Sequence, residues 1–313
     1  MSNLYWPIYK NLEREVLNLA DLIHFTDKQM SVYSVRIADI LVRCSVEIES
    51  LINDLYKETE EKGQEKTVGG KLKYLNDEWK LEEKRVTITS FNMHFSDDYK
   101  TFSPFKYDTK DSDDYYSAYN AVKHDRAKNF ETKATLHYLM RALSSLFVLN
   151  IYYKRKEVIP LGKAKTLPDT SFGSDIFTVH TNTRQPDKYG QKIIQDPLDL
   201  AAMYIIKVSN EHYKKYLKQL KDILYAKIEA FEEILDNNSS DENGNTDSNE
   251  YGLDTDFIEI ARDEKIDSER FKDLVNKIAT IDAKNRTPLD NMNFEAVLNK
   301  NQTIYHSIDG EEK

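Results

Sequence analysis

The sequence predicts an all-α fold, and three observations lead to that prediction. Apolar residues recur at three- and four-residue steps through most of the first half of the chain, which is the spacing of one helix face. Only 9 glycines and 7 prolines occur among 313 residues, a composition that favours helices over a sandwich or barrel. Hydrophobic residues make up 40% of the chain, enough for one sizeable core. We expect an antiparallel helical bundle with a short β-hairpin or loop insertion and an acidic, weakly structured tail.

The order of apolar stripes and breaks gives the predicted elements. A stripe from Leu12 to Ile23 marks a first helix, and a stripe from Ile37 to Leu55 marks a second that begins after Thr26-Asp27 and runs to about Glu60. The further predicted helices span residues 70–81, 112–125, 130–155 and 197–235. Alternating, β-branched sequence predicts extended segments at residues 86–89 and 176–179.

The helix predicted from Pro197 to Leu235 is unusually long. Asp196 followed by Pro197 is a helix start signal, and at about 1.5 Å per residue the helix would extend roughly 60 Å. A compact domain does not require that length, so we expect a dimer seam or a break. Its lysine stripe has two interpretations, a track for a phosphate backbone or a solvated helix face, and the second is favoured. The stripe consists of Lys207, Lys214, Lys218 and Lys221.

Three parts make up the predicted domain organisation. Residues 1–235 form the helical domain, with insertions at about 61–110 and 156–195. Residues 236–260 contain no Lys or Arg and are rich in Asn, Ser, Asp and Gly, so an acidic disordered linker is expected. Residues 261–313 are expected to form a short helical or extended tail, with one helix near residues 268–281.

Charge and cysteine content exclude several classes of protein. Residues 236–313 carry 9 Lys and Arg against 19 Asp and Glu, which accounts for the whole net charge of −10. An acidic total argues against nonspecific duplex binding, but it leaves room for RNA binding at a locally basic site. The single cysteine, Cys44, excludes a disulfide framework and a cysteine zinc site. No secretory segment and no apolar run of membrane-spanning length occurs, so a cytoplasmic protein without membrane contact is expected.

Several common catalytic motifs are also missing. The chain has no Gly-x-Ser-x-Gly elbow, no His-Glu-x-x-His motif and no Glu-x-x-His pair. The triplet Gly69-Gly70-Lys71 fails as a phosphate loop, because Leu72 occupies the position of the magnesium-binding hydroxyl. No metal or cofactor is therefore expected.

One segment, Tyr115 to Arg126, gathers chemistry at a predicted helix end. Asn120 and His124 stack at i and i+4, and Tyr119 and Lys123 form a second pair beside them. Imidazole, amide, ammonium and guanidinium groups on one helix end can bind a phosphate and move protons near neutral pH. Cationic residues at a helix C-terminus also stabilise the helix through its dipole, and from spacing alone that structural interpretation is favoured.

The second helix offers complementary charge. Arg36, Arg43 and Glu47 are separated by steps of seven and four, which places them on one face. Arg36 and Arg43 are therefore candidates for contacting a phosphate, together with Tyr119.

The order of these features resembles the HEPN superfamily, a group of helical-bundle domains in bacterial toxins, antiviral defence systems and RNA-processing enzymes. The features are a long helix with Arg36 and Glu47, a variable insertion, the segment Tyr119-Asn120-x-x-Lys123-His124-x-Arg126, and a following apolar helix. The resemblance covers roughly residues 9–155 and extends to the helix at 197–235.

The resemblance implies a metal-independent endoribonuclease that forms a homodimer and belongs to a toxin–antitoxin or defence context, with RNA and a possible protein partner. His124 would assist attack of the 2′-hydroxyl on the adjacent phosphate, Asn120 would be the nearby polar residue, and Lys123 and Arg126 would hold the phosphate. The positions where the family carries its arginine hold Ser117 to Tyr119 here. The alternative is therefore a non-catalytic helical adaptor or regulatory subunit that dimerises or docks a partner.

Overall fold

The computed structural model describes residues 3–59, 65–106, 114–153, 157–184, 197–236, 268–285 and 292–301. Most of these residues form helices, which confirms the prediction of a predominantly helical fold. Three small sheets accompany the helices, so an all-α description does not cover the described part of the chain.

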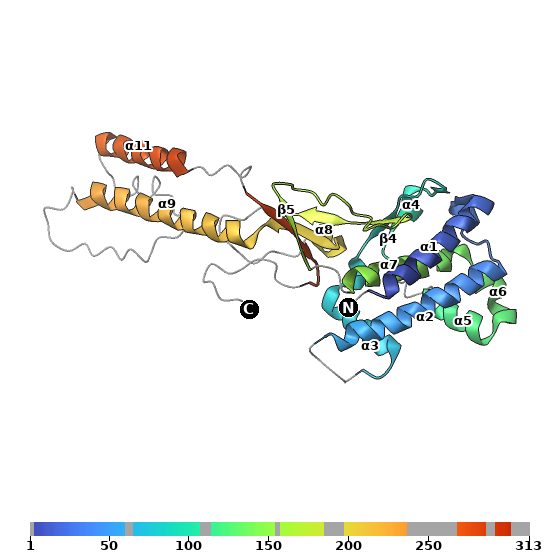
Figure 1. The fold of residues 1–313 in the computed structure, drawn as a ribbon. Coiled ribbons are helices and arrows are strands. Elements are labelled where there is room, and N and C mark those ends of the chain that lie inside the picture. The colour runs from blue at the N-terminus through green and yellow to red at the C-terminus, as the bar shows by residue number, and fades with distance from the viewer. Residues whose placement is uncertain are drawn as a thin grey trace.

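The helical bundle is built around α7 (Leu136–Tyr152), which packs against α1 (Tyr5–Leu22) and α2 (Val35–Lys57), as Figure 1 shows. Every residue of α7 except His137 and Arg141 is buried, so this helix forms the centre of the core. The apolar stripe predicted for the second helix is buried, which confirms it. Its members include Ile37, Leu41, Cys44, Ile48, Leu51, Ile52 and Leu55.

Shorter elements surround this centre. α3 (Val68–Trp79) and α5 (Tyr115–His124) pack against α2, and α6 (Arg126–Lys133) follows α5 directly. Four single-turn elements connect the larger ones: η1 (Asp27–Gln29), η2 (Leu81–Glu83), α4 (Asp97–Lys100) and α8 (Pro197–Ala201).

The strands pair over long sequence separations. The four-stranded sheet has the order β5-β9-β8-β7, with β7 parallel to β8 and the other pairs antiparallel. Its strands are β5 (Val158–Gly162), β7 (Thr181–Thr183), β8 (Tyr204–Val208) and β9 (Phe294–Leu298). An antiparallel sheet joins β4 (Thr101–Phe102), β2 (Val86–Ile88) and β6 (Phe177–Val179), and a parallel pair joins β1 (Phe25–Thr26) to β3 (Met93–His94).

The prediction of one continuous helix from residue 197 to residue 235 is wrong. The chain forms α8, then β8, and then α9 (Asn210–Asp236), so the break lies between residues 201 and 210. All five residues of β8 are buried inside the four-stranded sheet, because aromatic and β-branched residues suit a strand covered on both faces. Lys207 therefore leaves the predicted lysine stripe: it is buried on β8, with its Nζ 3.2 Å from Glu295 Oε1 of β9.

Two predicted helix starts are also corrected. α2 begins at Val35 instead of following Asp27, because residues before it bind α7 through the backbone: Leu136 N–H donates to Val32 O at 2.9 Å. Ser34 then caps α2 by accepting from the Ile37 N–H. The helix predicted over residues 130–155 is divided between α6 and α7.

The predicted hairpin within residues 156–195 is wrong as well. β5 pairs with β9 and β6 pairs with β2, so among the described residues neither strand pairs with a neighbouring segment of the chain. Beyond residue 260, α11 (Ser268–Asn285) confirms the helix predicted near residues 268–281. The expectation of an otherwise weakly structured tail is wrong at residues 294–298, which form the inner strand β9. The part of the predicted acidic linker at residues 237–260 lies outside the described residues.

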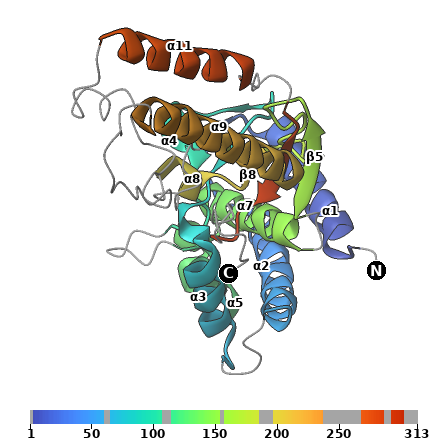
Figure 2. The same cartoon turned by 90° about the vertical axis from the view of Figure 1, so that its left-hand side faces the viewer.

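The overall shape is a bundle with a projecting arm. α9 and α11 lie side by side and extend away from the bundle, and the four-stranded sheet lies between the arm and the bundle (Figures 1 and 2). None of the helices in the described ranges combines the length and the apolar character that crossing a membrane requires.

Candidate functional site at the corner between α5 and α6

The segment singled out by its sequence forms a corner between two helices. Asp114 begins α5 by accepting a hydrogen bond from the Ser117 N–H. The helix ends at His124 because Asp125 leaves the helical region, with φ −144° and ψ 65°. Asn129 holds the corner by donating from its side-chain amide to the carbonyl oxygen of Asp125 at 3.0 Å. The predicted helix end near residue 125 is thus confirmed.

The apolar face of α5 sets the direction of the candidate residues. Tyr115, Ala118, Tyr119 and Val122 are buried against the bundle. The candidate residues on the other faces are Asn120, which is half-buried, and Lys123 and His124, which are exposed. The first three residues of α6 are exposed too, so Arg126 stands on the same open corner.

Lys123 is held by a neutral group. Its Nζ donates to the Tyr119 hydroxyl at 3.0 Å and lies 5.1 Å from the centre of the Tyr119 ring. This hydrogen bond raises the pKa of Lys123 above its ordinary value, so the ammonium keeps its charge at neutral pH. Because the partner carries no charge, the ammonium remains able to attract an anion.

Arg126 has an acidic partner, but the pair is loose. Arg126 Nη2 lies 3.5 Å from Asp39 Oδ1 of α2, and both side chains are about half exposed. Exposed ion pairs of this kind contribute less than about 1 kcal/mol, so a phosphate can replace the carboxylate at little cost.

His124 makes no hydrogen bond or ion pair with any residue that the structure describes, and its side chain is exposed. Asn120 likewise makes no side-chain hydrogen bond within the described ranges. An exposed imidazole that is not held by a neighbour can accept a proton from a bound substrate or donate one to it.

Arg36 and Arg43 lie three residues before and four residues after Asp39 on α2, and both are held by an acidic residue of α1. Their guanidinium groups lie 2.7 Å and 2.6 Å from the two carboxylate oxygens of Glu15 on α1. Both arginines therefore bind the same carboxylate. In the described residues, none of their ion pairs or hydrogen bonds involves a residue of the corner. A phosphate would have to compete with Glu15 for them. Glu47, their predicted companion, is half-buried, and burial raises the pKa of its carboxyl.

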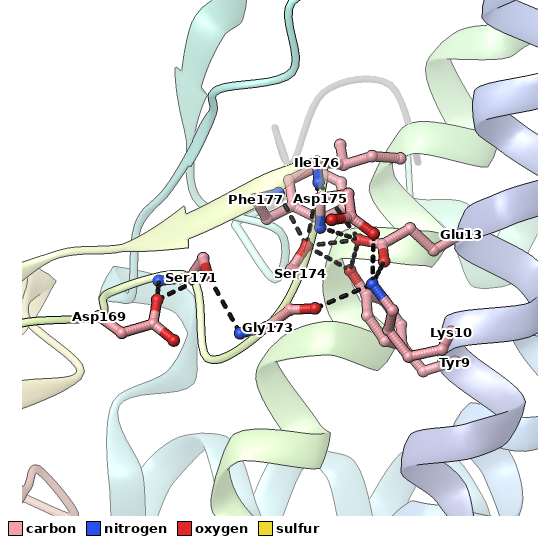
Figure 3. A network of polar contacts seen from close by, with 10 residues as sticks. All are labelled: Tyr9, Lys10, Glu13, Asp169, Ser171, Gly173, Ser174, Asp175, Ile176 and Phe177. Atoms are coloured by element: carbon pink, nitrogen blue, oxygen red, sulfur yellow. Dashed lines mark hydrogen bonds and ion pairs between the residues drawn. The ribbon is translucent and has the colours of Figure 1, made fainter.

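A buried polar network lies elsewhere, and sequence reasoning missed it (Figure 3). Glu13 of α1 is fully buried, and its Oε1 accepts hydrogen bonds from the Tyr9 hydroxyl at 2.7 Å and the Asp175 N–H at 3.0 Å. The Ser174 hydroxyl and the Ile176 N–H donate to the same oxygen. We call this set the Glu13 network.

The Glu13 network is satisfied internally. Lys10 bridges it by donating to Asp175 Oδ2 at 2.6 Å and to the Gly173 carbonyl oxygen at 2.8 Å. These contacts attach the loop that precedes β6 to α1, more than 150 residues away in sequence. Because its donors and acceptors are used within the protein, the network is a structural clamp, and the open corner is the better candidate site.

No group of three or more His, Cys, Asp or Glu side chains arranged to hold a metal ion occurs in the described ranges. Cys44 is buried in the core, where burial raises the pKa of its thiol well above the ordinary value. Comparison of the chain with protein-family models, with curated proteins and with solved structures finds no match. The side chains at the corner are therefore the basis for assigning a function.

Proposed function

We propose that the corner between α5 and α6 binds the phosphate backbone of RNA and that the chain is a HEPN-type, metal-independent endoribonuclease of a prokaryotic toxin or antiviral defence system. The observation that carries the proposal is the group of three exposed cationic or titratable side chains there, Lys123, His124 and Arg126. None of them is committed to a strong partner, because Lys123 contacts a phenol, Arg126 has a loose ion pair and His124 is unpaired within the described residues.

The proposed reaction needs the chemistry that this corner offers. The 2′-oxygen of a ribose attacks the adjacent phosphorus while a base takes the 2′-hydroxyl proton. The bond from phosphorus to the 5′-oxygen breaks, and that oxygen receives a proton, which leaves a 2′,3′-cyclic phosphate and a 5′-hydroxyl. His124 serves as acid or base, Asn120 orients it or the substrate, and Lys123 and Arg126 stabilise the charge that develops on phosphate.

One corner supplies a single imidazole, whereas the reaction needs both a base and an acid. The resemblance to HEPN domains implies a homodimer in which two corners face one cleft, and the second copy then provides the second imidazole. Arg36 and Arg43 contribute only where the substrate displaces Glu15, so we assign them a secondary role in phosphate binding.

A second candidate function is a non-catalytic helical adaptor or regulatory subunit. The projecting arm of α9 and α11 favours it, because such an arm presents a long helical surface to a partner (Figure 1). The positions 117–119, which lack arginine, favour it too.

RNA binding by corner variants separates these functions. The variant Lys123→Ala/Arg126→Ala should bind labelled single-stranded RNA about tenfold or more weakly than the wild type, and its affinity should depend less on salt, because each lost phosphate contact lowers the salt slope by about 0.7. Lys73→Ala, an exposed lysine on α3, is the matched control and should bind like the wild type. Equal binding and equal salt slopes for all three proteins would contradict the proposal and favour the adaptor.

A further inference from the structure

One face of α9 carries an ordered series of charges. At 100° per residue, about 3.6 residues per turn, six residues share a face no wider than roughly 80°. In chain order they are Lys214, Lys218, Lys221, Tyr225, Glu229 and Glu232. The first three are basic, the last two are acidic, and an aromatic residue separates them. We call this series the α9 face.

The spacing of the α9 face is symmetric about Tyr225. Lys221 and Glu229 lie four residues before and after it, and Lys218 and Glu232 lie seven residues before and after it. A twofold axis through Tyr225, perpendicular to the helix, therefore places Lys221 and Lys218 of one copy opposite Glu229 and Glu232 of another.

The α9 face is not covered by α11. α11 binds another side of α9 through ion pairs of Lys227 with Asp282 (2.7 Å) and Lys277 with Glu233 (2.8 Å). The Tyr225 side chain is 65% exposed. In the described part of the chain, Lys218 and Lys221 make no ion pair, and neither do Glu229 and Glu232.

We propose that the α9 face is a self-association surface, on which a second copy of this chain packs antiparallel with the two Tyr225 side chains in contact at the axis. Exposed ion pairs are individually weak, so the contact is a weak, salt-sensitive dimer contact whose charges set orientation and register. The paired aromatic rings supply the central apolar contact.

The charges favour a second copy over RNA as the occupant. Lysines spaced three and four residues apart repel one another on a helix, and a polyanion would relieve that repulsion. A polyanion lying along the same face would, however, meet Glu229 and Glu232 after Tyr225. A second α9 in antiparallel orientation satisfies both halves of the face at once.

A charge swap tests the proposal on the full chain. By sedimentation velocity at low salt, the wild type should self-associate with a dissociation constant that rises as salt is added. Lys218→Glu/Lys221→Glu and Glu229→Lys/Glu232→Lys should each weaken self-association about tenfold or more, because every cross-copy pair becomes repulsive. Lys66→Glu/Lys73→Glu makes the same change in net charge at two exposed lysines outside the α9 face, so it controls for net charge.

Mixing the two charge-reversed variants gives the decisive result. All four cross-copy pairs become attractive again in the heterodimer, so association should return to the wild-type level. The chain carrying all four substitutions should also self-associate at the wild-type level. Circular dichroism identifies any variant that fails to fold, and the fourfold variant replaces it as the test. A wild type that stays monomeric at about 1 mM, or a mixture that remains monomeric, overturns the proposal. The proposal is also overturned if the lysine variants lose RNA binding while they self-associate as strongly as the wild type. This inference does not depend on the proposed ribonuclease activity, which the corner variants test separately.

Discussion

The buried amine of Lys84 makes the stability of the protein depend on pH. Lys84 lies between η2 and β2 with no exposed surface, and its Nζ donates to the carbonyl oxygens of Leu200 at 3.0 Å and Ala202 at 3.2 Å. In the described residues no carboxylate lies within ion-pair distance of it. Burial lowers the pKa of Lys84 from 10.5 to about 7.

The sign of the effect follows from proton binding. Between pH 7 and the unfolded pKa of 10.5, the unfolded chain holds a proton on Lys84 that the folded protein releases. The free energy of unfolding therefore rises with pH, and this group alone contributes a rise of about 2 kcal/mol from pH 7 to pH 9. Lys84→Met removes that contribution. The variant also leaves the Leu200 carbonyl without this donor, which lowers stability at every pH. The readout is therefore the change in the free energy of unfolding with pH, rather than its value at one pH.

Urea denaturation at pH 7, 8 and 9 measures the effect. The difference in free energy of unfolding between the wild type and Lys84→Met should change by about 2 kcal/mol across that range. Lys73→Met, which removes an exposed lysine from the neighbouring α3, should follow the wild type. If the free energies of unfolding of Lys84→Met and the wild type change equally with pH, Lys84 keeps its proton in the folded protein. The lowered pKa of Lys84 would then be contradicted.

Three further substitutions test the packing and the site. Glu13→Ala should lower the free energy of unfolding by about 3 kcal/mol, because buried hydroxyl and N–H donors lose their acceptor; a loss below about 1 kcal/mol in equilibrium denaturation would contradict the clamp. Glu295→Gln should cost about 3 kcal/mol, because Lys207 loses its ionic partner on β9, and unchanged stability would show that β9 does not carry this pair. Arg126→Ala should change stability by less than about 1 kcal/mol in the same assay while RNA binding weakens; a large loss of stability would mean that the residue is structural.

The sequence was sufficient for the elements whose signals are local. The stripe from Ile37 to Leu55 predicted the buried face of α2, because helix periodicity follows from neighbours three and four residues apart. The end of α5 was predicted next to Asp125, and the candidate side chains of that segment lie together at the corner. Local spacing also predicted that Tyr119 and Lys123 pair, as they do.

Elements held by distant partners were not predictable in this way. β8 follows α8 within three residues and its apolar run fits a helix equally well, so only its pairing with β9, about 90 residues later, decides its conformation. The contact of Glu15 with Arg36 and Arg43 depends on how α1 packs against α2. The Glu13 network is the same case, because its loop partners lie far along the chain.

RNA cleavage tests most directly whether His124 acts on RNA at the α5–α6 corner. Purified wild-type protein and His124→Ala should be incubated with labelled total and transfer RNA in EDTA, beside His94→Ala, which removes another exposed histidine. We expect the wild type and His94→Ala alone to cut the RNA, each leaving a 2′,3′-cyclic phosphate. Equal cleavage by His124→Ala would contradict the assignment of His124. Absence of cleavage by all three proteins would contradict the enzymatic function and leave the adaptor.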